Sequence, residues 1–254
     1  MKDLKLTLLL LVLAVMPAFA SNITTGEELI AAMHKKYDGK WYKTLTFVQK
    51  TITHKPDGTT SAETWYEAMS LPGKLRIDID PIEKGNGILF ADGKVFSFRD
   101  GKTTGGRPFV HPLMVLGFDV YGQPVESTIS QVKGMGIDLS AIRQDKWLGK
   151  DVYVVGAKSG DAATPQFWVD KKTLVFVRLI QAAGRDKKSV AETQFNKYVK
   201  AKGGWVAAEV LFFVDGKATT TEEYSDIRAD VSLDADLWNP EKWTSVDRTY
   251  YKKK

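Results

Sequence analysis

The sequence contains no cysteine among its 254 residues. This absence excludes disulfide bonds, thiolate metal sites, thiol catalysis and lipid attachment through a cysteine. A protein without such cross-links depends on an ordinary hydrophobic core, and a chain of this length is long enough to bury one.

Histidine is also scarce, with only His34, His54 and His111 in the chain. No two of them have the spacing of metal ligands or of an acid–base pair. The sequence lacks a Gly-x-Ser-x-Gly nucleophile motif and a Ser-x-x-Lys pair. The glycine-rich stretch 101–106 does not have the residue order of a phosphate-binding loop. We therefore expect no enzyme activity, no bound metal and no cofactor.

The charge of the chain has no strong bias, since the formal net charge is +5 and acidic and basic residues are mixed. The one same-sign run is the terminal Lys252, Lys253 and Lys254. A nucleic-acid site needs a continuous basic surface, which this distribution does not provide. We expect no binding to nucleic acid.

The N-terminus has the pattern of a cleaved secretory signal. Lys2 and Lys5 precede the apolar run 6–16, and Ala18 and Ala20 fit the small-residue cleavage pattern. The apolar run is shorter than the roughly 20 residues of a membrane-spanning helix, so an N-terminal membrane anchor is the weaker alternative. We expect cleavage after Ala20, export across the inner membrane, and a single domain formed by residues 21–254.

A helix is expected directly after the signal. Thr25 and Glu28 have the spacing of a capping box, in which the threonine hydroxyl and the glutamate carboxylate satisfy the first backbone N–H groups. The residues Leu29, Ile30, Met33 and Tyr37 then form one apolar stripe at helical spacing. The helix should end near 38–39, because glycine commonly follows the last turn.

Strands make up most of the remaining chain. We expect them at residues 44–54, 64–70, 74–80, 87–90 and 95–98, and again at 144–148, 151–158, 189–200, 205–214 and 218–227. Asp92-Gly93 and Asp215-Gly216 are typical of tight hairpin turns. Turn signals at this spacing indicate an antiparallel sandwich or barrel.

Residues 103–142 interrupt this series of strands. Gly105, Gly106, Pro108 and Pro112 break regular structure. Stretch 113–120 is apolar enough for a short helix or a buried loop, and stretch 125–132 fits another short helix. A crossing segment of this length is more often functional than passive.

The stretch 164–180 predicts a hairpin with apolar side chains on both faces. In its second strand Phe176 and Ile180 point to one face, and Val175, Val177 and Leu179 to the other. One face can pack in a core, but the other needs a second cover, such as a helix or a bound apolar ligand.

The strand 74–80 alternates between two faces. Leu75 and Ile77 point to one face, whereas Arg76, Asp78 and Asp80 point to the other. A solvated strand face that deters edge pairing is the simpler interpretation of the charged face. The alternative is a hydrolase site built on the two aspartates, which would need a polar cleft and a raised pKa.

Aromatic residues occur on nearly every expected strand. An ordinary core accounts for some of them. A curved sheet whose concave face holds acyl chains would also use apolar groups on both strand faces.

Several short motifs, in their order along the chain, resemble the outer-membrane lipoprotein carrier (LolA-like) family. After the signal and the amphipathic helix, the aromatic-rich first strand 41–53 is similar to that of the family. Pro72-Gly73-Lys74-Leu75-Arg76 resembles its Pro-Gly-x-x-Arg stretch. The hairpin 90–98 and the strands 148–153 and 167–173 are similar to its remaining motifs. The insertion 103–142 and the lysine tail depart from the family pattern.

This resemblance implies a mainly β fold with covering helices, in which a curved antiparallel sheet forms an incomplete β-barrel around a hydrophobic cavity. It implies a monomeric periplasmic carrier that takes lipoprotein acyl chains or other lipids from an inner-membrane release complex to an outer-membrane acceptor. Helix 29–37 and segment 113–120 would be movable covers. The residues expected at the cavity and its lid are Leu29, Met33, Phe47, Trp65, Leu75, Ile77, Phe90, Phe96 and Phe176.

Arg76 occupies the position of the arginine that helps to govern lid opening in that family. We expect it to donate hydrogen bonds to backbone carbonyls of the covering helix, or else to lie in solvent. A different class of function stays open on the same fold, namely a module that docks another envelope protein or senses envelope stress without taking up lipid.

Overall fold

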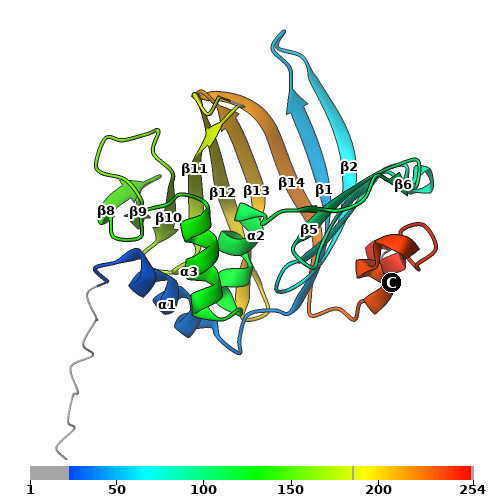
Figure 1. Cartoon of the computed structure of the whole chain (residues 1–254), viewed down its shortest axis with the longest axis horizontal. Coiled ribbons are helices and arrows are strands. Elements are labelled where there is room, and N and C mark those ends of the chain that lie inside the picture. The colour runs from blue at the N-terminus through cyan, green and yellow to red at the C-terminus, as the bar shows by residue number, and fades with distance from the viewer. Residues whose placement is uncertain (1–22, 185, 253–254) are drawn as a thin grey trace, which may run out of the picture.

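The computed structural model describes residues 23–184 and 186–252. The predicted signal peptide lies outside the described residues. One antiparallel sheet runs through the described part of the chain, in the strand order β6-β5-β4-β3-β2-β1-β14-β13-β12-β11-β10-β9-β8, with β7 paired to β5. The sheet curves around three helices without closing on itself (Figure 1). The predicted mainly β fold with an incomplete barrel is confirmed.

The first half of the sheet comes from strands before the interruption. Their bounds are β1 (Thr44–His54), β2 (Thr60–Ser70), β3 (Lys74–Ile79), β4 (Gly87–Ala91), β5 (Lys94–Arg99), β6 (Lys102–Thr103) and β7 (Arg107–Pro108). The predicted hairpin at Asp92-Gly93 forms between β4 and β5, and both turn residues have positive φ. Strand β2 begins four residues earlier than expected because Thr60–Glu63 continue the pairing with β1.

The second half comes from strands after the interruption. They are β8 (Ile142–Trp147), β9 (Lys150–Val155), β10 (Gln166–Asp170), β11 (Phe176–Ala183), β12 (Ser189–Ala201), β13 (Gly204–Val214) and β14 (Lys217–Ala229). Strand β14 pairs with β1, so the first and the last long strands of the chain meet in the middle of the sheet.

The helices gather on the concave face of the sheet (Figure 1). They are α1 (Gly26–Tyr37), α2 (Pro112–Gly117) and α3 (Val125–Gly134), with the 3₁₀ turn η2 (Asp119–Tyr121) after α2. The interruption 103–142 therefore supplies most of the helical cover. As expected, the Thr25 hydroxyl accepts a hydrogen bond from the Glu28 N–H, at 3.1 Å. The Glu28 carboxylate bonds Thr24 rather than Thr25.

The opposite face of β2–β5 is covered by the chain after β14. This C-terminal segment, residues 230–252, contains the 3₁₀ turns η3 (Ala235–Trp238), η4 (Pro240–Lys242) and η5 (Thr249–Tyr251). A short η1 (Ile82–Lys84) lies between β3 and β4. Two hydrophobic clusters result, a large one between the helices and the concave face and a small one under the C-terminal segment.

Candidate functional site

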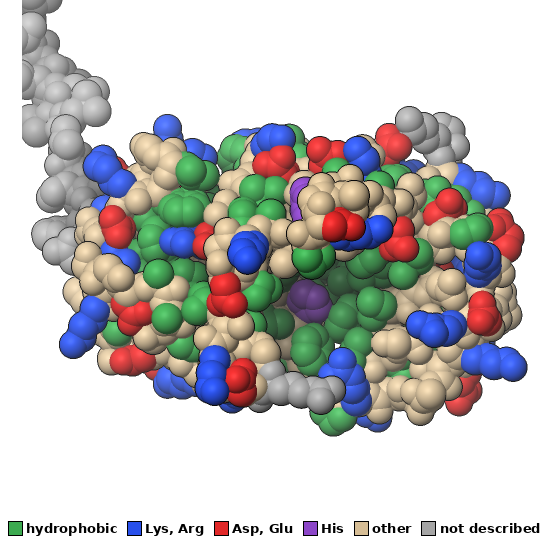
Figure 2. Space-filling model, turned by 90° about the horizontal axis from the view of Figure 1, so that it is seen from above, with side chains coloured by type: hydrophobic (Ala, Val, Ile, Leu, Met, Phe, Trp, Pro, Cys, Tyr) green, Lys and Arg blue, Asp and Glu red, His purple; other side chains and the backbone are tan. Residues whose placement is uncertain are grey.

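A cavity of about 240 Å³ lies between α2 and the concave face of strands β1–β4 and β12–β14. Viewed from above, the molecule is hollowed at its centre, and mainly hydrophobic side chains surround the hollow (Figure 2). The cavity is lined by Phe47, Gln49, Trp65, Glu67, Met69, Leu75, Ile77, Ile88, Phe90, His111, Leu113, Met114, Phe118, Phe195, Phe212, Glu222 and Tyr224.

Five of the nine residues expected at the cavity line it, namely Phe47, Trp65, Leu75, Ile77 and Phe90. Strand alternation brings them to one face, and Leu75 pairs directly with Phe90 across β3 and β4. Three others, Leu29, Met33 and Phe176, are fully buried in the large cluster between the helices and the sheet and do not line the cavity.

Phe96 does not line the cavity either, because the register of the β4–β5 hairpin places it on the opposite face. Phe90 pairs with Val95 and Leu89 pairs with Phe96. Paired residues share a face, so Phe96 lies with Leu89 against the small cluster under the C-terminal segment. The two-residue turn Asp92-Gly93 sets this register, so the expectation that Phe96 lines the cavity is wrong.

The sheet side of the cavity also carries three polar residues that sequence reasoning missed, Gln49, Glu67 and Glu222, which we call the polar floor. Gln49 on β1 lies opposite Trp65 on β2 and Tyr224 on β14. Glu67 lies on β2 and Glu222 on β14, the two strands that flank β1. Tyr224 donates a hydrogen bond of 2.7 Å to Glu222. Burial raises the pKa of Glu222 to about 7. Burial and the neighbouring Glu222 raise the pKa of Glu67 well above its usual range. Glu67 lies two residues from both Trp65 and Met69, so strand alternation puts the three on one face of β2. That spacing was the signal in the sequence that Glu67 faces the cavity.

His111 lies at the mouth of the cavity and begins α2. Its Nδ1 accepts a hydrogen bond of 3.4 Å from the N–H of Met114, so the ring caps the helix. The ring also meets Phe90 edge-on, with centroids 4.9 Å apart. Burial lowers the pKa of His111 to about 4, so the imidazole is neutral at neutral pH.

A second hollow of about 210 Å³ lies on the outer side of the same segment. It shares Phe90, His111 and Met114 with the cavity. The start of α2 therefore separates two hollows, and a displacement of this helix would join them.

The helical cover is attached to the sheet by η2. The hydroxyl of Tyr121 accepts a hydrogen bond of 2.9 Å from the backbone N–H of Phe176, and the Tyr121 ring stacks on Trp41 with centroids 3.8 Å apart. Asp119 accepts a bond of 3.2 Å from the N–H of Gly73, and burial raises the pKa of this carboxyl to about 7.

Arg76 does not contact the helices. It is fully buried on the face of β3 away from the cavity, and its guanidinium forms hydrogen bonds to the carbonyls of Leu237 and Trp243, at 3.4 and 2.7 Å. The expectation that Arg76 bonds the covering helix is wrong, because the carbonyls it meets belong to the C-terminal segment. The expectation of a solvated strand face is also wrong for Arg76 and Asp78, since that segment excludes solvent from both.

Asp78 and Asp80 do not form a carboxylate pair in a cleft. Asp78 is buried and accepts hydrogen bonds from Arg76 and from the hydroxyl of Tyr250, the latter at 2.7 Å, whereas Asp80 is exposed beyond the strand end. Among the described residues no group of three or more histidine or acidic side chains has the geometry of a metal site.

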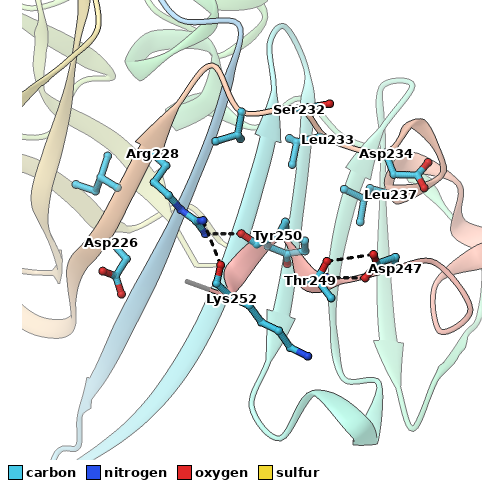
Figure 3. Close-up of a pocket in the computed structure, with 12 residues that line it drawn as sticks. Asp226, Arg228, Ser232, Leu233, Asp234, Leu237, Asp247, Thr249, Tyr250 and Lys252 are labelled. Atoms are coloured by element: carbon cyan, nitrogen blue, oxygen red, sulfur yellow. Dashed lines mark hydrogen bonds between the residues drawn. The ribbon is translucent and has the colours of Figure 1, made fainter. Parts of the chain in front are cut away.

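A wider groove of about 820 Å³ lies between the end of β14 and the C-terminal segment (Figure 3). Arg228 spans it and donates hydrogen bonds to the backbone carbonyls of Tyr250 and Lys252, while Thr249 is bonded to Asp247. These contacts hold the chain end against the sheet. The groove is more polar than the cavity under α2, so we place the candidate site at the cavity.

No helix in the described residues has the length and apolar character needed to cross a membrane.

No protein-family profile matches this chain, and no curated protein matches it. Several solved structures are similar to this chain. A putative outer membrane lipoprotein-sorting protein domain from Vibrio parahaemolyticus has a TM-score of 0.58 at 16% identity, over 86% of this chain and 99% of that one. A DUF1329 family protein from Desulfovibrio piger has a TM-score of 0.57 at 15% identity, over 84% and 95%.

A LolA superfamily protein from Nitrosomonas europaea has a TM-score of 0.52 at 13% identity, over 82% of this chain and 96% of that chain. The three likenesses cover nearly the whole of each solved chain. The chain therefore has the LolA-like fold that its short sequence motifs implied.

Proposed function

We propose that this protein is a periplasmic carrier that holds an acyl chain of a lipoprotein or of another lipid in the cavity under α2. The observation that carries the proposal is the cavity itself, whose lining is mainly apolar on the sheet side and on the helix side. The fold likeness to a lipoprotein-sorting domain supports the same class of cargo. Such a carrier would receive its cargo from an inner-membrane release complex and pass it to an outer-membrane acceptor.

The volume of the cavity supports a closed, unloaded state. Sites that enclose a drug-sized ligand have about 300–1,000 Å³, and this cavity has about 240 Å³. A longer chain would fit if α2 moved, because the second hollow lies directly behind the start of this helix. Loading would then be coupled to displacement of α2, with α1 and η2 as the remaining cover.

The energetics allow both transport and release. Each buried methylene contributes about 0.8 kcal/mol, so ten methylenes contribute roughly 8 kcal/mol before the costs of association and helix displacement. A chain held in this way is stable in water but can pass to an acceptor that buries more of it.

The test is binding of an uncharged fluorescent probe with a long aliphatic chain and its displacement by a purified lipoprotein. Leu113 lies at the rim of the cavity and is only partly buried, so Leu113→Trp should narrow the entrance without disturbing the core. The matched control is Leu148→Trp, since Leu148 is 69% exposed and lies outside the cavity. We expect the first variant to lower probe affinity about tenfold and the second to leave it unchanged.

A wild-type protein that binds neither probe nor lipoprotein would contradict the carrier function and favour a module that docks another envelope protein. Equal loss of affinity in the two tryptophan variants would show that the probe binds outside the cavity.

A further inference from the structure

The floor of the cavity carries a carboxyl group without a partner. Glu67 is 5% exposed and lines the cavity. Among the described residues its carboxyl group has no hydrogen-bond donor, and the electrostatic influence on it comes from Glu222, which is also acidic. This carboxyl opens into the cavity, so a ligand there can supply the hydrogen-bond donor that the protein does not.

Glu222 lies on the other side of β1 and faces the same space. Phe47 of β1 pairs with Glu67, and Thr51 pairs with Glu222, so the two carboxyls flank the part of β1 that carries Gln49. Tyr224 donates to one oxygen of Glu222 at 2.7 Å, and the Gln49 side chain also forms a hydrogen bond with this carboxyl. The carboxyl of Glu222 can accept further hydrogen bonds from a ligand.

No described lysine or arginine lines the cavity. Lys50, next to Gln49 on β1, points to the other face of the sheet, where it forms an ion pair with Glu223 at 3.4 Å. His111 is the only basic group in the lining, and its lowered pKa leaves it neutral. Glu63, on the same face of β2, is exposed and bonds the Trp65 indole N–H at 3.1 Å. Among the residues that the structure describes, the lining is therefore acidic and apolar and contains no lysine or arginine.

We propose that the cavity binds a cationic amphiphile, an aliphatic chain that ends in a protonated amine, with the ammonium group between Glu67 and Glu222. This inference rests on the proposed carrier function and names the chemistry of its cargo. The ammonium group donates three hydrogen bonds, and its positive charge favours the ionised form of both carboxyls. Charge-assisted hydrogen bonds of this kind are stronger than those between neutral groups. The aliphatic chain lies along Leu75, Ile77 and Met114.

The test compares three ligands with the same chain, dodecylamine, dodecanol and dodecanoate, each below its micelle concentration at about pH 8. Isothermal titration calorimetry on the wild-type protein should give at least about tenfold tighter binding for the amine than for the alcohol. Dodecanoate should bind most weakly, because its carboxylate has no hydrogen to donate and is repelled by the ionised forms of Glu67 and Glu222. The wild-type comparison needs no variant and so does not depend on variant folding.

Glu67→Gln should remove the preference for the amine and leave dodecanol binding unchanged. The matched control is Glu223→Gln, which removes the same charge from the neighbouring position of Glu222 on the outer face. Equal affinity for amine and alcohol, or an equal effect of Glu67→Gln and Glu223→Gln, overturns the inference but leaves the carrier function standing. If none of the three ligands binds, the carrier function and this inference both fail.

Discussion

Arg76 and Asp78, two residues apart on β3, form a fully buried bidentate ion pair, with Nε–Oδ2 and Nη2–Oδ1 distances of 2.7 and 3.0 Å. The guanidinium also stacks on the ring of Trp243, 3.8 Å from its centroid. Arg248 approaches Asp78 at 3.6 Å. The pair thus attaches the C-terminal segment to the sheet, and its role is structural.

Replacing one partner of this pair should destabilise the protein strongly. Arg76→Leu leaves the Asp78 carboxylate buried without its main partner, and removal of one member of a buried pair typically costs about 3–5 kcal/mol. Urea unfolding measures the loss. Arg99→Leu is the control, because Arg99 is exposed on β5 and its loss should change stability by less than about 0.5 kcal/mol. Equal stability of Arg76→Leu and the wild type would remove the structural role.

Tyr121→Phe should loosen the helical cover. The substitution keeps the ring that stacks on Trp41 but removes the hydroxyl that accepts the Phe176 N–H. A buried N–H left without an acceptor costs about 1–3 kcal/mol. Hydrogen exchange should become faster at Phe176 and in η2, with little change at the β12–β13 pairing. Unchanged exchange at Phe176 would contradict this attachment.

Gly87→Ala should destabilise the sheet because no room exists for a side chain there. A Cβ on Gly87 would lie 2.1 Å from the carbonyl oxygen of Ile77 and 2.7 Å from the Trp243 ring. Overpacking of this kind costs about 1–3 kcal/mol. Gly122→Ala is the matched control, since a Cβ at Gly122 has no neighbour within 4 Å and its φ of −143° suits alanine. Thermal unfolding should show a lower midpoint only for Gly87→Ala.

Glu222→Gln should make stability less dependent on pH. Burial raises the folded-state pKa of Glu222 from 4.5 to about 7. Below pH 4.5 the carboxyl is protonated in the folded and unfolded states alike. Between that pH and about 7 the unfolded state releases its proton first, so the wild type loses stability as the pH rises.

Glutamine carries no proton to lose and keeps an oxygen that accepts from Tyr224. The variant should therefore match the wild type near pH 4 and exceed it by about 1–3 kcal/mol near pH 8. Urea midpoints across this range measure the difference. Glu223→Gln is the control on the outer face, and a similar gain there would point to a general charge effect.

Local patterns determined much of the architecture from the sequence alone. The Thr25 cap and the stripe from Leu29 to Tyr37 predicted α1, and the turn at Asp92-Gly93 predicted the β4–β5 hairpin. The alternation in strand 74–80 put Leu75 and Ile77 on one face and Arg76 and Asp78 on the other, as observed. These signals are carried by neighbouring residues, whose spacing fixes their relative directions.

Only the tertiary structure decided what covers each face. Arg76 looked like a surface or lid residue because its cover, Trp243, lies 167 positions further along the chain. Glu67 and Glu222 share the cavity floor because β1 pairs with β14, a contact between the two ends of the described chain. The alternation of residues along a strand predicts which side chains share a face. Burial, and with it the charge state of a carboxyl, depends on which distant segment packs there, and no local spacing encodes that choice.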